Sequence, residues 1–119
     1  MTQIIKQTAE KANHLIKNGQ LKNSIKFLTK ALHTNPHFEL FFIRANALKS
    51  LGLSKKALED YNRALSINPR ASHVYVNRGI LFSELNQTTN ALNDYEFAIS
   101  INPKDHLAYF NRGKCFQKL

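Results

Sequence analysis

The sequence predicts an all-α protein built from repeated helical hairpins. An Asn-Pro pair recurs at three places, and the second and third pairs are 34 residues apart. Other residues recur with the same period, and no segment shows the two-residue alternation of a β-strand. A fixed period of this length is typical of repeat architectures, in which stacked units share one core. The recurring residues are Asn35-Pro36, Asn68-Pro69 and Asn102-Pro103, with Arg44, Arg78 and Arg112.

Each repeat is expected to contain two short helices. Gly19, Gly52 and Asn86 lie where a tight turn would join the two helices of a unit. The Asn-Pro pairs end the second helices, because proline disfavours helical geometry in the residue before it. We therefore expect helices over residues 3–17, 21–34, 38–50, 54–67, 71–84 and 88–101, followed by a last helix over residues 105–118.

The repeated positions resemble the signature of the tetratricopeptide repeat (TPR) family. Small residues alternate with aromatic ones, which allows two helices to interdigitate closely. The resemblance is strongest in the third unit, which carries Tyr75, Arg78-Gly79, Phe82, Ala91, Tyr95, Ala98 and Pro103. It implies a right-handed α-solenoid of three helix-turn-helix units plus one closing helix. Residues 1–119 would form a single TPR domain, with units at about 5–37, 38–71 and 72–105 and a half-unit at 106–119.

Two arginine–aspartate spacings suggest a repeated ion pair. Arg44 precedes Asp60 by 16 residues, and Arg78 precedes Asp94 by the same number. In a helical hairpin this spacing could bring each pair together across the two helices. Such a pair would contribute about 0.2–1 kcal/mol if it were exposed. The alternative is two unrelated, solvated charges.

The sequence contains no pattern that favours catalysis. The single cysteine, Cys115, excludes a disulfide framework and a cysteine-based zinc cluster. The five histidines do not have metal-ligand spacing, and there is no glycine-rich phosphate loop or nucleophile elbow. We therefore expect neither an enzyme nor a bound cofactor or metal.

The net charge of +9 favours an acidic partner, which could be a peptide, a nucleic acid or an anionic lipid. The longest apolar run, residues 40–43, is far shorter than the ~20 residues of a membrane span. The chain opens without a secretory signal pattern. We expect a soluble, intracellular and cytoplasmic protein.

The family resemblance implies a concave groove, lined by the first helix of each unit, that binds an extended peptide. Asparagine suits such a groove because its side chain both donates and accepts hydrogen bonds to a peptide backbone. The alternative is that these asparagines are ordinary polar surface positions. The candidate peptide-binding residues are Asn13, Phe42, Asn46, Asn77, Asn111 and Lys114.

Some TPR domains grip the acidic C-terminus of heat-shock chaperones with paired lysine, arginine and asparagine side chains. At the corresponding positions this chain has Ala9, Asn13, Ile43, His73 and Asn77. Without paired cations a terminal carboxylate loses its charge-assisted contacts. Binding of a chaperone tail is therefore not expected.

Two other surfaces are candidates for binding. A basic convex ridge would comprise Lys22, Lys26, Lys30, Lys55, Lys56 and Arg63, and it could meet nucleic acid or an acidic protein. Few aromatic residues interleave with the ridge, so a solvated helix face is the alternative. Tyr109 and Phe116 would form an open C-terminal face on the last helix. That face marks either a cut in a longer array or a docking site for a partner or a second copy, as in a homodimer.

The favoured function is a non-catalytic scaffold or adaptor that binds a peptide segment of a partner protein. The alternatives are a structural subunit that packs into a larger assembly through its C-terminal face and, third, a nucleic-acid binder that uses the basic ridge.

Overall fold

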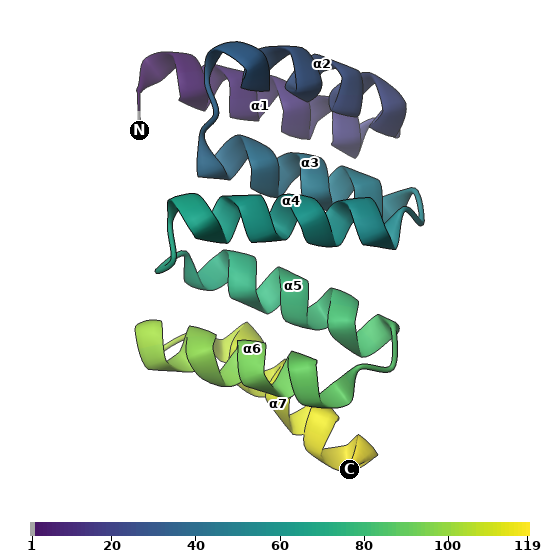
Figure 1. The fold of residues 1–119 in the computed structure, drawn as a ribbon, viewed down its shortest axis with the longest axis vertical. Coiled ribbons are helices and arrows are strands. Elements are labelled where there is room, and N and C mark those ends of the chain that lie inside the picture. The colour runs from purple at the N-terminus through teal and green to yellow at the C-terminus, as the bar shows by residue number, and fades with distance from the viewer. Residues whose placement is uncertain (1) are drawn as a thin grey trace. The chain divides into compact units, whose positions relative to one another are not determined.

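The computed structural model describes residues 2–119, and these residues form seven α-helices and no strand. Figure 1 shows them in chain order. The expected helices are confirmed to within one residue at each end. The helices are α1 (Gln3–Lys17), α2 (Leu21–Thr34), α3 (Phe38–Ser50), α4 (Ser54–Ile67), α5 (Ser72–Glu84), α6 (Thr88–Ile101) and α7 (His106–Lys118).

The turn and stop signals act as predicted. Gly19, Gly52 and Asn86 have φ values of 79°, 81° and 61°. These values lie in the left-handed region, which glycine tolerates without steric cost and asparagine tolerates better than most residues. Asn68 and Asn102, each followed by proline, adopt extended geometry with φ near −130° and end α4 and α6.

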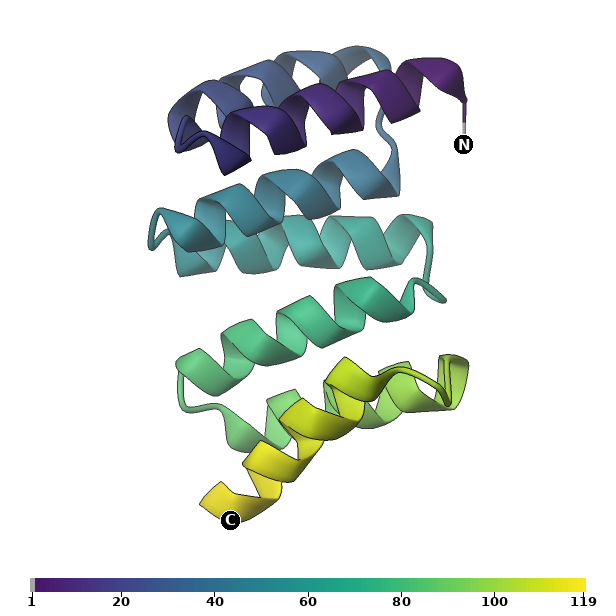
Figure 2. The ribbon, with the colours of Figure 1, turned by 180° about the vertical axis from the view of Figure 1, so that it is seen from behind.

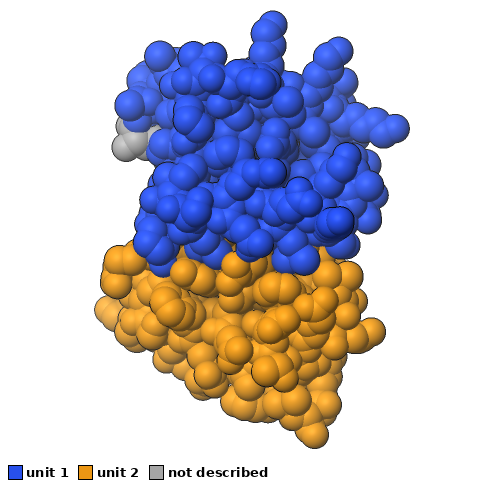
Figure 3. All heavy atoms as spheres, in the orientation of Figure 1, with its two compact units in different colours: residues 1–69 blue, residues 70–119 orange. Residues whose placement is uncertain are grey.

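The chain divides into two units, residues 1–69 and residues 70–119 (Figure 3). In the first unit α1 packs on α2, and α3 packs on α4 as an antiparallel hairpin (Figures 1 and 2). The helices α1 and α3 also pack on each other. In the second unit α5 and α6 form the hairpin, and α7 packs on both.

Each unit has a buried core built from the repeated positions. Tyr61 and Tyr95 are the largest fully buried side chains, and Gly79 lies against the Tyr95 ring. Alanines that are completely buried flank these tyrosines on α4 and α6. The alternation of small and large residues therefore lets the helices of each hairpin approach closely, as the sequence predicts. The flanking alanines are Ala57, Ala64, Ala91 and Ala98.

Candidate functional site

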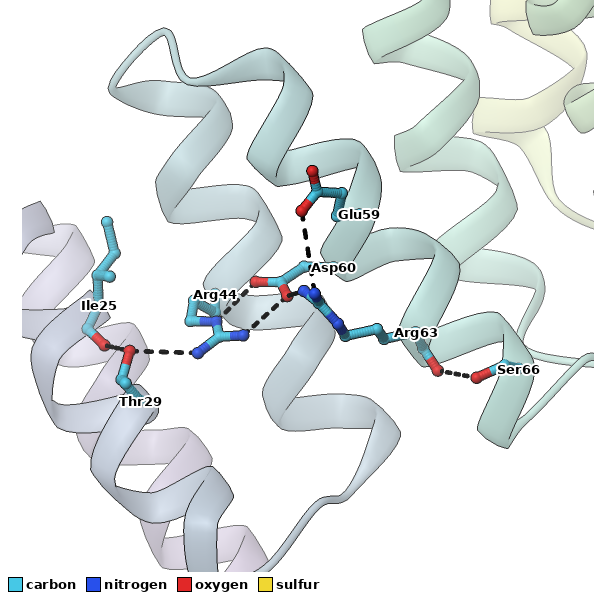
Figure 4. A network of polar contacts seen from close by, with 7 residues as sticks. All are labelled: Ile25, Thr29, Arg44, Glu59, Asp60, Arg63 and Ser66. Carbon is cyan, nitrogen blue, oxygen red and sulfur yellow. Dashed lines mark hydrogen bonds and ion pairs between the residues drawn. The ribbon is translucent and has the colours of Figure 1, made fainter.

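A buried carboxylate joins α3 to α4 in the first unit (Figure 4). The Nε and Nη2 atoms of Arg44 donate to the two carboxylate oxygens of Asp60, at 2.6 and 2.8 Å. Nη1 of Arg63 donates to Asp60 at 2.8 Å, and Nη1 of Arg44 donates to the Thr29 hydroxyl at 3.2 Å. The expected Arg44–Asp60 pair is confirmed. It is stronger than an exposed pair because Asp60 is only 1% exposed and the contact is bidentate.

The second unit repeats this arrangement. Nε and Nη2 of Arg78 donate to the carboxylate of Asp94 at 2.9 and 2.8 Å. The hydrogen bond to Asp94 raises the pKa of Arg78. The guanidinium also lies 5.6 Å from the ring centroids of both Tyr75 and Phe82, at cation–π distance. Both pairs lie inside a hairpin and hold its two helices together.

The basic ridge lies wholly in the first unit and is less uniform than the sequence suggests. The lysines of the ridge are exposed on α2 and α4. Arg63 is half-exposed, but its charge is shared with Asp60 and with Glu59, whose carboxylate lies 3.9 Å away. A cavity of about 260 Å³ adjoins the ridge, and its polar lining includes Arg44, Asp60 and Arg63. Arg63 therefore contributes to the Asp60 network rather than to an open stripe of positive charge.

The candidate peptide-binding residues of the first unit differ in how accessible they are. Asn13 is exposed on α1. Phe42 is partly buried, and its ring centroid lies 6.2 Å from that of Tyr61. Asn46 is also partly buried, and its Oδ1 accepts a hydrogen bond of 2.5 Å from the Tyr61 hydroxyl. This oxygen is therefore committed to the fold, which the sequence did not indicate.

In the second unit, Asn111 and Lys114 adjoin a cavity of about 280 Å³. Asn77 is partly buried on α5, whereas Lys114 is exposed and its ammonium lies 5.3 Å from the Phe110 ring. Asn111 is only 9% exposed, and its amide nitrogen donates to the Leu107 carbonyl at 2.9 Å. It is thus a lining residue of the cavity and not an exposed clamp.

Tyr95 is a lining residue of this cavity that the sequence analysis assigned only to the core. It is 1% exposed, and its hydroxyl makes no hydrogen bond with any residue in the range 2–119. The equivalent tyrosine, Tyr61, donates to Asn46, but position 80 holds isoleucine where an asparagine would be needed. Burial raises the pKa of the Tyr95 phenol, which keeps it a neutral donor. The loss of the asparagine at position 80 is the sequence signal that could have identified this tyrosine.

The remaining lining residues give the cavity a positive balance. Lys114 and Lys118 contribute two ammonium groups against the carboxylate of Glu84. The Lys118 ammonium also donates to the Ser83 hydroxyl at 3.2 Å, which joins α7 to α5. The cavity can therefore offer a phenol hydrogen and cationic groups to a hydrogen-bond acceptor or an anion.

The outer face of α7 is exposed, as expected for the open C-terminal face. Tyr109 is 40% exposed and Phe116 is 51% exposed, and the Arg112 guanidinium lies between them, 5.2 and 5.8 Å from the two ring centroids. Cys115 points away from this face and is buried, which raises the pKa of its thiol. Such a thiol packs as an apolar side chain and is a poor nucleophile at neutral pH.

Among residues 2–119, no group of three or more histidine, cysteine, aspartate or glutamate side chains could hold a metal ion. No helix in the same range is long and apolar enough to cross a membrane.

Family comparisons agree with these repeats. A family model described as tetratricopeptide repeat matches residues 39–70, and a second, described as TPR repeat, matches residues 79–119. The two matches cover the α3–α4 hairpin, most of α5, and all of α6 and α7. The chain belongs to the tetratricopeptide repeat family, and its fold class is the all-α helical solenoid of that family. TPR repeats are generally non-catalytic modules for protein–protein interaction.

Solved TPR domains have the same fold. The first TPR domain of human RPAP3 is 28% identical with a TM-score of 0.88, over 92% of this chain and 87% of that one. The first TPR of Spaghetti (RPAP3), bound to the HSP90 peptide SRMEEVD, is 28% identical with a TM-score of 0.87, over 93% and 89% of the two chains. The Arabidopsis OM64 TPR domain is 23% identical with a TM-score of 0.87, over 96% and 95%, and shows the fold alone.

One curated relative carries a similar segment. The UDP-N-acetylglucosamine–peptide N-acetylglucosaminyltransferase of Giardia intestinalis is 36% identical over 74 residues. The match covers 61% of this chain but only 5% of that enzyme.

Proposed function

We propose that this chain is a scaffold or adaptor module that binds an extended peptide segment of a partner protein on the first helices of its units. The observation that carries the proposal is the cavity of the second unit, where the unpartnered Tyr95 hydroxyl lies among Asn111, Lys114 and Lys118. The likeness to the first TPR of Spaghetti, which holds a peptide, supports the same mode of binding.

The ligand that suits this cavity is an acidic side chain of the bound segment. A carboxylate accepts hydrogen bonds only, and the cavity offers a phenol and two ammonium groups as donors. Hydrogen bonds between charged groups are shorter and stronger than neutral ones. The net charge of +9 favours an acidic partner as well.

The ligand differs from the chaperone tails that some TPR domains bind. The positions that would supply paired cations hold Ala9 and His73, and His73 is exposed on α5. We expect an internal acidic segment to bind more tightly than a free C-terminal carboxylate. The proposal includes a cytoplasmic location for the module.

A peptide library tests the proposal directly. The probe is a set of unstructured nine-residue peptides with either glutamate or glutamine at the central position and blocked ends. The wild-type chain should retain the glutamate peptides in preference. The double variant Lys114→Gln, Lys118→Gln should lose that preference, and Tyr95→Phe should weaken binding of both sets.

The matched control removes the same charge elsewhere. Lys22→Gln with Lys26→Gln lowers the net charge equally, but both lysines lie on α2 of the first unit. The control should bind like wild type. If the control loses binding instead, the basic ridge is the binding surface, and the nucleic-acid alternative then predicts a steep decrease of affinity with salt. If no peptide is retained by any chain, peptide binding is wrong.

A further inference from the structure

An arginine set against aromatic rings recurs on three first helices. Arg44 lies 5.6 Å from the Phe41 ring, and Arg78 lies between Tyr75 and Phe82. In both cases the guanidinium also holds a buried aspartate on the next helix. Arg112 has the same aromatic setting on α7, but no carboxylate among residues 2–119 pairs with it.

The glycine that follows each of the last two arginines shows the same difference. A Cβ atom placed on Gly79 would lie 2.6 Å from Cε1 of Tyr95 and 3.2 Å from Cβ of Asp94. The Tyr95 ring and the Asp94 side chain therefore fill the space over Gly79. A Cβ atom on Gly113 would have no neighbour within 4 Å. The outer face of α7 thus has an unpaired cation and an open space at the positions that Asp94 and Tyr95 occupy over α5.

We propose that the outer face of α7, formed by Tyr109, Arg112, Gly113 and Phe116, docks a helix of a partner protein that carries adjacent aspartate and tyrosine residues. The aspartate would pair with Arg112 and the tyrosine ring would lie over Gly113. The occupant is defined by this molecule itself, because Asp60-Tyr61 and Asp94-Tyr95 cover the two equivalent faces. In both helices alanines three residues before the aspartate and three after the tyrosine are fully buried.

A second copy of the chain does not fit this description. Both of its Asp-Tyr pairs are buried within their own hairpins, so neither is available to another molecule. The proposed occupant is therefore a helix of a different protein. The site is separate from the peptide-binding cavity, which is lined by other residues of α7.

The probe is a peptide with the sequence of α6, residues 88–101, added to the intact chain. A free helix of this length is marginal in water, so a lactam should link positions 89 and 93, which are exposed in α6. Isotope-labelled wild-type chain should show saturable binding, with the largest chemical-shift changes at Tyr109, Arg112 and Phe116.

Matched variants separate docking from unfolding. Arg112→Gln in the chain, or Asp94→Asn in the peptide, should weaken binding about tenfold, because the charge-assisted pair is lost. Gly113→Leu should abolish binding while the melting temperature stays at or above that of wild type, because the added side chain has open space. Lys104→Gln removes the same charge from an exposed loop position and should bind normally.

Three results would overturn the proposal. The first is no saturable binding of the peptide, and the second is binding that Arg112→Gln and Gly113→Leu leave unchanged. The third is self-association of the wild-type chain in sedimentation that Gly113→Leu removes, which would make a second copy the occupant. None of these results bears on the acidic-peptide library, because Lys114 and Lys118 are unaltered in these variants.

Discussion

Asp60 and Asp94 show how one residue can join two helices. Each carboxylate is almost fully buried, and each accepts two hydrogen bonds from an arginine that remains partly exposed. Burial of a charge is costly unless the charge is paired and hydrogen-bonded. The arginines therefore satisfy the carboxylates while their own outer edges stay in contact with water.

Removal of the charge at Asp94 should be costly. Asp94→Asn leaves Arg78 with a weaker acceptor in the same place, and we expect a loss of about 2 kcal/mol in the free energy of unfolding. Urea denaturation followed by circular dichroism measures this loss. Glu96→Gln is the control, since Glu96 is exposed on the same helix, and it should change stability by less than about 0.5 kcal/mol. Equal effects of the two substitutions would contradict a structural role for the pair.

The packing of α5 on α6 depends on the size of a single residue. Gly79 leaves room for the Tyr95 ring at a distance that no Cβ atom could occupy. Gly113 holds the equivalent position on α7 and meets nothing. The same residue type at the same repeat position therefore has opposite consequences for the two helices.

Alanine at each glycine should separate these consequences. Gly79→Ala should destabilise the chain by about 1–3 kcal/mol, because α5 or the Tyr95 ring must shift. Gly113→Ala should stabilise it by about 0.5–1 kcal/mol, because alanine favours the helix and the site is open. Thermal unfolding of the two variants measures both effects. A fall in melting temperature for Gly113→Ala would mean that the outer face of α7 is already covered.

Across the whole chain, positive charge decreases toward the C-terminus. Residues 1–37 carry a net charge of +5, residues 38–70 carry +3 and residues 71–119 carry +1. The basic ridge is thus a property of the first unit, whereas the second unit presents the cavity around Tyr95 and the outer face of α7. The two units differ in the partner chemistry that their surfaces favour.

The stability of the whole chain should fall as the pH rises above about 9. Burial raises the pKa of Cys115 above its ordinary value of 9.0, and it raises the pKa of Tyr95 above 10.0. The unfolded chain releases these protons at lower pH than the folded chain, so unfolding becomes more favourable above those ordinary values. Each proton contributes a slope of at most about 1.4 kcal/mol per pH unit.

Denaturation of wild type and Cys115→Ala between about pH 8 and pH 10 tests this. The variant should lose less stability over that interval, because one of the two buried acids is gone. The comparison uses the slopes and not the absolute stabilities, since the smaller side chain also leaves a cavity. Identical slopes would show that Cys115 ionises equally easily in the folded chain.

Local signals were sufficient to predict the helices and their ends. Proline after Asn68 and Asn102 stops a helix through steric contact with the preceding residue, and Gly52 permits a positive φ. These effects act over a few residues, so the sequence carries them in full. The Arg44–Asp60 and Arg78–Asp94 pairs were also predictable, because an exact repeat turns one spacing into two independent observations.

The candidate site was predicted less completely. Asn111 and Lys114 do adjoin a cavity, but Asn46 is bonded to Tyr61, and Arg63 is paired with Asp60. Hydrogen-bond partners of this kind come from another helix, and the helical periodicity of one segment does not reveal them. The Tyr95 hydroxyl depends on what stands at position 80 on a different helix.

The sequence by itself determined the repeat, the seven helices and the family, because period, capping and turn chemistry are local. Only the tertiary structure decided which polar groups are satisfied within each unit and which remain available. Asp60 and Asp94 became internal, whereas the Tyr95 hydroxyl and Arg112 were left without a partner among residues 2–119. The physical reason is that satisfaction of a buried group depends on distances of about 3 Å between helices. Only packing sets those distances.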